Sequence, residues 1–175
     1  DEQLEDFLRD KEKKLNLSNQ KNETTLKDLT SKIIQLGGKP NLQNKDQVAL
    51  IKELNRQFDQ LSVGSILRDK TKNKINDQVI NGIKVRFQNV LDLPFKDLRK
   101  LIDEGKKEIG EGLVIIYAIN DSKVGLAVGV TKKLENKFDA VKIVRVGSEI
   151  IGGKGGGGRI DFAQAGGTLP DKIQE

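Results

Sequence analysis

Apolar residues in the first third of the chain recur at the spacing of amphipathic helices. Leu8, Leu15, Leu29 and Leu36 follow a seven-residue repeat, the repeat of a helical seam, with Asn22 at the step between Leu15 and Leu29. Gly37 and Gly38, followed by Pro40, are expected to end this first helix, because glycine suits the left-handed C-cap and proline cannot continue a helix. The early part of the helix is expected to fray unless a partner covers Leu4 and Phe7.

A second amphipathic stripe follows the turn, with apolar residues at Val48, Ile51, Leu54, Phe58 and Leu61. Two amphipathic helices joined by so short a turn run antiparallel, so residues 1–61 are predicted to form a helical hairpin or coiled coil. A two-helix hairpin has little core of its own, so its stripe is expected to meet either a second chain or the rest of this one. The candidate dimer or hairpin interface contains Leu26, Leu29, Ile33, Leu36, Ile51, Leu54 and Phe58.

After residue 64 the apolar pattern changes to the period of two that is typical of strands. The dipeptide Asn81-Gly82, set between β-branched residues, predicts a hairpin turn. Further elements are predicted from the continuous apolar runs and the helical spacings: a helix from Pro94 onward, buried strands over 113–119 and 124–130, and a helix over 137–150. This order of strands and helices predicts an α/β (α+β) domain built on a mixed sheet.

The net charge of +5 is concentrated in one part of the chain. Residues 62–107 hold 11 Lys and Arg against six Asp and Glu, while the segments before and after them are balanced. We expect a basic linker at 62–75, between the helical hairpin and a globular domain at 76–175. Its lysines, Lys72 and Lys74 among them, would either keep a flexible linker soluble or form a stripe that faces phosphates, and the sequence leaves both interpretations open.

The composition excludes several classes of site. The chain contains no Cys and no His, so a disulfide scaffold, a thiol nucleophile, a His-dependent triad and an ordinary zinc site are excluded. Aromatic residues make up 4% of the chain, which argues against a broad platform for stacking bases. No apolar run approaches the roughly 20 residues of a membrane span, and no signal peptide opens the chain. The absence of Met suggests a processed chain or a piece of a longer protein.

The segment 151–167, IGGKGGGGRIDFAQAGG, contains eight of the 18 glycines. It matches neither the Walker pattern nor GxGxxG after a strand. A flexible linker and a kink that lets two backbones pack closely are the structural interpretations. We favour a loop that faces a ligand, because backbone N–H groups without neighbouring Cβ atoms bind anions and Lys154 and Arg159 bracket them. Asp161 and Gln164 would add polar contacts or tie down the loop.

This segment carries a resemblance to a known family. GGKGGGGRIDFAQAGG closely resembles the GGKGGGRxDxAQAGG signature of the DHHA1 domain at the C-terminus of bacterial alanyl-tRNA synthetase. The resemblance extends back through VINGIKV, LVIIYAI, VGLAVGV and KFDAVKIV, and the helical hairpin is similar to the coiled-coil part of the same C-terminal region. It therefore covers essentially the whole chain, with one extra glycine before Arg159 and Phe162 where Met is common.

The resemblance implies a noncatalytic domain that binds the outer corner of tRNA, with the helical part a source of dimer contacts. It also implies a cytoplasmic parent enzyme with two further domains: a catalytic domain that would use ATP and Mg²⁺, and an editing domain that would use zinc. We expect this chain to hold no cofactor and to bind no membrane. The candidate tRNA-binding residues are Gly153, Lys154, Gly155, Gly156, Gly157, Gly158, Arg159, Asp161, Gln164, Lys72 and Lys74.

Two other functions are weighed beside tRNA binding. A related domain closes DHH-type phosphoesterases and contacts their nucleic-acid substrate, but the Asp-His-His metal set of such enzymes is missing from a chain without His. A purely structural oligomerisation module is the other alternative, with the seam around Leu26, Leu29, Ile33 and Leu36 as its interface.

Overall fold

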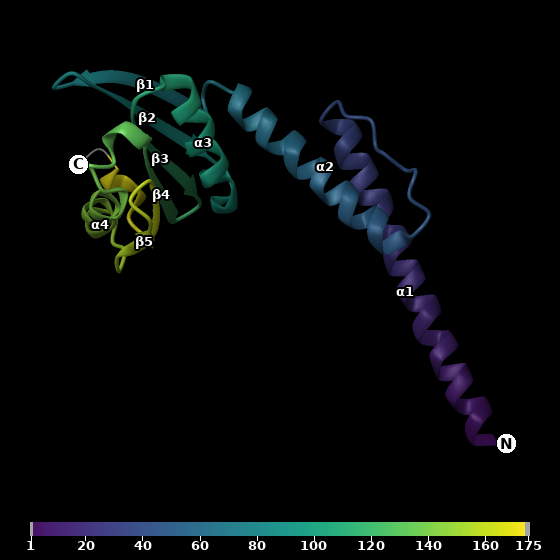
Figure 1. Ribbon diagram of the computed structural model, residues 1–175. Helices are drawn as coiled ribbons and strands as arrows, with labels where there is room; N and C mark the ends of the chain where they lie inside the picture. The colour runs from purple at the N-terminus through teal and green to yellow at the C-terminus, as the bar shows by residue number, and fades with distance from the viewer. Residues whose placement is uncertain (1, 174–175) are drawn as a thin grey trace. The chain divides into compact units, whose positions relative to one another are not determined.

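The first part of the chain is a pair of long helices, α1 (Glu2–Gln35) and α2 (Gln47–Arg68), in the computed structural model, which describes residues 2–173 (Figure 1). The end of α1 follows the prediction. The amide of Gly37 donates to the carbonyl of Ile34 and that of Gly38 to the carbonyl of Ile33, each at 2.9 Å, and Gly37 has a φ of 81°. These two bonds form a Schellman motif, which satisfies carbonyl groups at the helix end.

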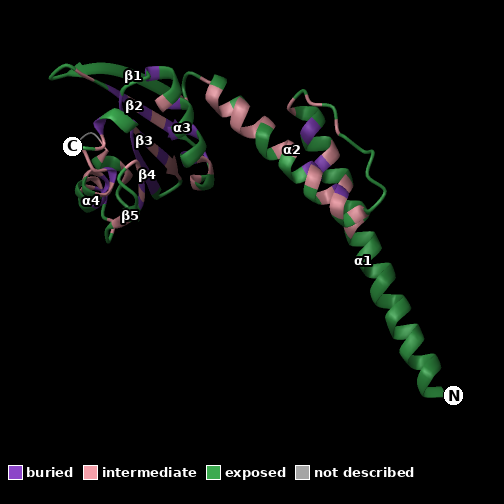
Figure 2. Cartoon of the chain, in the orientation of Figure 1, coloured by how far each residue is buried: buried purple, intermediate pink, exposed green. Residues whose placement is uncertain are grey.

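The two helices pack against each other along a short seam. Its buried residues are Leu29, Ile33, Leu50 and Leu54, flanked by Leu26, Ile51, Phe58 and Leu61. Figure 2 shows that, within these two helices, the buried residues lie in this overlap, while the first half of α1 is exposed along its length. That half is helical rather than frayed. Leu36 is half-buried and lies outside the seam cluster.

The expected stripe on the second helix is wrong at one position. Val48 is 67% exposed, whereas Leu50, which the stripe omitted, is buried. At 3.6 residues per turn, Val48 points about 120° away from Leu54 around the helix axis, while Leu50 lies within about 40° of it. The packed face is therefore centred on Leu50 and Leu54, with Ile51 and Phe58 at its sides.

Helix and strand occupy the interval 62–75, where a basic linker was expected. Helix α2 continues to Arg68 and strand β1 begins at Asn73, so only a short turn connects them. The turn is fixed by Asp69, whose carboxylate accepts from the amide and the hydroxyl of Thr71 at 2.9 and 2.6 Å. The same bonds lower the pKa of Asp69. The chain divides into two compact units after Ser65, within the interval 62–75 that was expected to separate them.

The second unit is built on one six-stranded sheet in the order β1-β2-β3-β4-β6-β5. The strands are β1 (Asn73–Ile80), β2 (Ile83–Leu91), β3 (Gly112–Asn120), β4 (Lys123–Val130), β5 (Gly156–Gly158) and β6 (Phe162–Gly167). Strands β2 and β3 are parallel, joined by helix α3 (Leu98–Ile109), and every other pair is antiparallel. This arrangement confirms the predicted mixed-sheet α/β fold, including the Asn81-Gly82 turn, where both residues have a positive φ.

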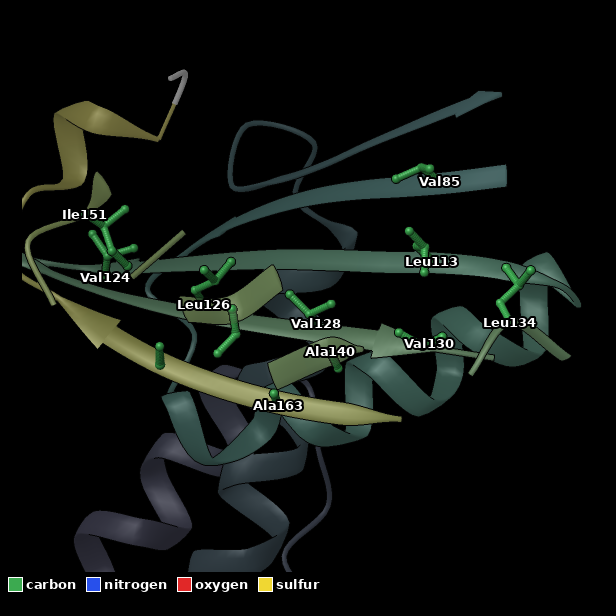
Figure 3. Close-up of a cluster of buried hydrophobic side chains, with 12 residues drawn as sticks. Val85, Leu113, Val124, Leu126, Val128, Val130, Leu134, Ala140, Ile151 and Ala163 are labelled. Atoms are coloured by element: carbon green, nitrogen blue, oxygen red, sulfur yellow. The ribbon is translucent and has the colours of Figure 1, made fainter. Parts of the chain in front are cut away.

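Two helices of this unit, α3 and α4 (Ala140–Ile150), pack on opposite faces of the sheet, and each covers a different set of strands (Figure 1). Helix α3 packs on β2, β3 and β4, and α4 packs on β4, β5 and β6. Residues of β4 point alternately to the two faces of the sheet. A Cβ on Gly129 would meet Ile102 of α3 on one face, whereas Leu126 meets Gly147 of α4 on the other. The α4 side holds the main apolar cluster, which includes Val128, Ala140 and Ala163 (Figure 3).

Candidate functional site

The glycine segment, expected to be a loop, forms a hairpin at one edge of the sheet. Strand β5 pairs antiparallel with β6, with Gly157 opposite Gln164. The hairpin closes with a bond from the amide of Arg159 to the carbonyl of Phe162 at 2.7 Å and its reciprocal at 3.3 Å. The short strand β5 is therefore the outermost strand, and its free edge is made of glycine backbone.

Close packing against α4 explains several of the glycines. A Cβ on Gly153 would overlap the carbonyl oxygen of Gly166 and the hydroxyl of Ser148, and one on Gly156 would lie 2.6 Å from Val144. The buried hydroxyl of Ser148 also accepts from the amide of Gly155 at 3.1 Å. Here the structural interpretation, two backbones in close approach, describes the segment well.

Gly157 is different, because nothing in the fold requires a glycine there. A Cβ at this position would meet no atom within 4 Å, and its φ lies outside the left-handed range. Gly166 is also exposed, with its nearest neighbour 3.7 Å from a Cβ. Gly157 lies directly across from Gln164, and Gly166 is two residues further along β6, so all three lie on the side of the sheet that carries α3, in the part that α3 does not cover. We call Gly157, Gln164 and Gly166 the open strip.

The two cations that bracket the glycines are accessible. Lys154 is exposed, and within the described residues its ammonium group has no ion pair. The Arg159 side chain is 68% exposed, with its Nε 3.6 Å from a carboxylate oxygen of Asp161. An exposed ion pair at this distance contributes little, so Arg159 keeps its capacity to bind an anion.

Lys72 and Lys74 do not join this site. Lys74 lies on β1, the strand at the opposite edge of the sheet from β5, and Lys72 immediately precedes β1. Lys72 pairs with Asp92 at 3.1 Å. A third cation of the basic stretch, Arg86, is enclosed between β1 and α3, where it binds Asp77 at 2.8 and 2.9 Å and also Glu108. These bonds raise the pKa of Arg86 and lower the pKa of Asp77.

The structure brings other cations to the glycine hairpin that sequence reasoning missed. The ammonium group of Lys106, on α3, donates to the carbonyl oxygen of Asp161 at 2.7 Å. Lys106 also lines an open pocket with Lys107 and Lys132 beside Asp161. Arg99, also on α3, lies over the ring of Phe162, with its guanidinium carbon 5.2 Å from the ring centroid. The seven-residue spacing of Arg99 and Lys106 was a signal that both share one side of this helix.

No metal site is formed by the part of the chain that the structure describes, where no group of three or more Asp, Glu, His or Cys is placed to hold an ion. Among residues 2–173 no helix is long and apolar enough to span a membrane.

The chain is similar in sequence to known proteins. The DHHA1 domain family matches residues 82–175. An alanine–tRNA ligase of Rhodopseudomonas palustris is 39% identical over 146 residues, which is 82% of this chain and 15% of that protein. An alanine–tRNA ligase of Hyphomonas neptunium is 46% identical over 98 residues, which is 56% of this chain and 11% of that protein. The chain therefore spans a small part of the length of these relatives.

A solved structure is similar as well. The C-Ala domain of Aquifex aeolicus alanyl-tRNA synthetase superposes with a TM-score of 0.54 at 27% sequence identity. The superposition covers 57% of this chain and 88% of that domain. The similarity therefore extends from sequence to three-dimensional structure.

Proposed function

Because the chain belongs to the DHHA1 domain family, we propose that it is the C-terminal, tRNA-binding module of a cytoplasmic alanine–tRNA ligase. In this proposal the module grips the outer corner, or elbow, of an alanine-accepting tRNA. It thereby assists the catalytic and editing domains of the parent chain, which would hold ATP, Mg²⁺ and Zn²⁺. The module itself binds and positions tRNA and performs no chemistry.

One observation carries the proposal: the open strip lies on the same edge hairpin as two accessible cations, Lys154 and Arg159. Phosphates supply most of the binding energy for nucleic acids, through release of condensed counterions by Lys and Arg. Folded RNA is recognised largely by shape, which requires a surface that approaches the backbone and base edges closely. A strip with no Cβ at Gly157 and Gly166 permits that approach.

The first test removes the two cations together. Lys154→Ala with Arg159→Ala is expected to weaken tRNA binding by more than tenfold at 0.1 M salt and to make the log–log salt slope shallower by about two, because each phosphate contact contributes about one to that slope. Thermal stability should not change, because both side chains are exposed. Titration of tRNA binding at several salt concentrations measures the affinity and the salt slope, and thermal unfolding measures the stability.

Lys52→Ala with Arg56→Ala is the matched control, since it removes one exposed lysine and one exposed arginine from α2. It should leave tRNA binding unchanged. A wild-type salt slope near zero, or equal binding to duplex DNA of the same length, contradicts the proposed function.

We also propose that the module dimerises through the first half of α1. Of the residues expected at a dimer or hairpin interface, Leu29, Ile33 and Leu54 are buried within the hairpin. An apolar stripe on the same helix remains exposed, at Leu4, Phe7, Leu8 and Leu15. Leu8 and Leu15 are seven residues apart, the spacing of a coiled-coil seam, so a second copy of this helix is a fitting partner.

Leu8→Glu with Leu15→Glu is expected to convert the dimer to a monomer, because charged residues are not tolerated at a coiled-coil seam. Sedimentation at several protein concentrations measures the change, with Lys13→Glu, at an exposed position outside the stripe, as the control. A wild-type protein that remains monomeric at high concentration contradicts the dimer.

A further inference from the structure

Beside the open strip, the side chains of Arg99 and Phe162, which come from different elements, form a cation–π contact. Phe162 is the first residue of β6, and its half-buried side chain lies on the face that carries Gln164. Arg99 projects from α3, which packs on β2, β3 and β4. Its guanidinium carbon lies 5.2 Å from the centroid of the Phe162 ring, within the range of a cation–π contact. The pair therefore stands at the boundary between the covered and the uncovered parts of this face.

The ring is the partner that the structure gives to Arg99. Arg99 is exposed, and among the described residues it forms no ion pair with a carboxylate, although Asp103 stands one helical turn further along α3. A guanidinium group held on an aromatic ring retains its outer π face and its N–H donors. Arg99 thus presents a flat, cationic surface to solvent.

A flat cationic surface of this kind suits a nucleobase better than a phosphate. Bases that are splayed out of folded RNA stack on aromatic rings and on guanidinium planes, and this contact tolerates any base because every base has a π face. Gln164, two residues along β6, offers a donor and an acceptor for a base edge. Gly166 and Gly157 leave the approach to that amide free of side chains.

We propose that Arg99 and Phe162 form a stacking site for one unpaired nucleobase of the bound RNA, with Gln164 against the edge of that base. This inference rests on the proposed function and assigns it a second kind of contact. Lys154 and Arg159 neutralise phosphates, whereas the Arg99–Phe162 pair binds a base through its face. The two contributions differ in salt dependence, because stacking releases no counterions.

Arg99→Lys tests the site, since it keeps the positive charge and removes the guanidinium plane. Affinity for tRNA is expected to fall about fivefold to tenfold, with the log–log salt slope unchanged. Arg56→Lys, at an exposed position on α2, is the matched control and should have no effect. Thermal unfolding of Arg99→Lys is expected to match that of the wild type, because an exposed side chain contributes little to stability.

Phe162→Trp gives an independent readout, because the chain contains no Trp and the new indole would be the sole tryptophan fluorophore. Its fluorescence is expected to be quenched when tRNA binds, and to be quenched less when Arg99→Lys is added. Undiminished binding by Arg99→Lys together with an unquenched indole overturns the stacking site while the proposed function stands. Failure of the wild type to bind tRNA at all overturns both.

Discussion

Replacing Gly153 with alanine is expected to destabilise the α/β unit by about 2–3 kcal/mol, the cost of inserting an atom where a packed structure has no room. The added Cβ would overlap the carbonyl oxygen of Gly166 and the hydroxyl of Ser148. Neither neighbour is the end of a flexible chain: one is backbone, and Ser148 is fully buried and bonded to the amide of Gly155. The hairpin and the end of α4 must therefore move apart.

Gly157→Ala is the matched control, four residues along the same segment. Its Cβ would meet nothing within 4 Å, so the free energy of unfolding should change by less than about 0.5 kcal/mol. Urea denaturation measures both variants. Because Gly157 belongs to the open strip, the same variant is expected to weaken tRNA binding while it remains fully folded. Equal destabilisation by the two substitutions would show that the whole segment serves packing alone.

The contrast between these glycines marks what sequence reasoning alone missed at the site. The pattern of eight glycines with Lys154 and Arg159 identified the segment, but it did not show which glycines are needed for packing. That distinction depends on Ser148, Val144 and the partner strand, which lie near the glycines only after α4 and β6 have packed. Strand pairing of β5 was likewise invisible, since a run of glycines has no alternating pattern to predict a strand.

Local signals, by contrast, predicted most of the fold. The Asn81-Gly82 turn and the end of α1 at Gly37 follow from backbone conformations that few residues adopt.

Lys72 and Lys74 were assigned to the site because they are near in sequence to other cations, yet the order of strands places Lys74 at the edge opposite β5. Arg99 was missed because it is far from the glycine segment in sequence and approaches Phe162 only through the packing of α3 on the sheet.

Ile33→Ala is expected to cost the helical hairpin about 3–4 kcal/mol, whereas Ile34→Ala should be neutral or slightly stabilising. Ile33 is fully buried in the seam, and its truncation removes apolar contacts and leaves a cavity. Ile34 is 58% exposed, and alanine has the higher helix propensity by a few tenths of a kcal/mol. The two substitutions remove the same atoms from adjacent positions of one helix, so burial is the variable that differs.

The large cost at Ile33 follows from the small size of the seam, in which the buried residues are Leu29, Ile33, Leu50 and Leu54. Each of them carries a large share of the stability of its unit, because the free energy of a small core is the sum of few contacts. Hydrogen exchange of the α1 and α2 amides resolves this unit separately from the sheet, whose amides should keep their protection in both variants. Equal protection of α1 in the two variants would mean that the exposed face of the helix, not the seam, holds it in place, as when a second chain covers Ile34.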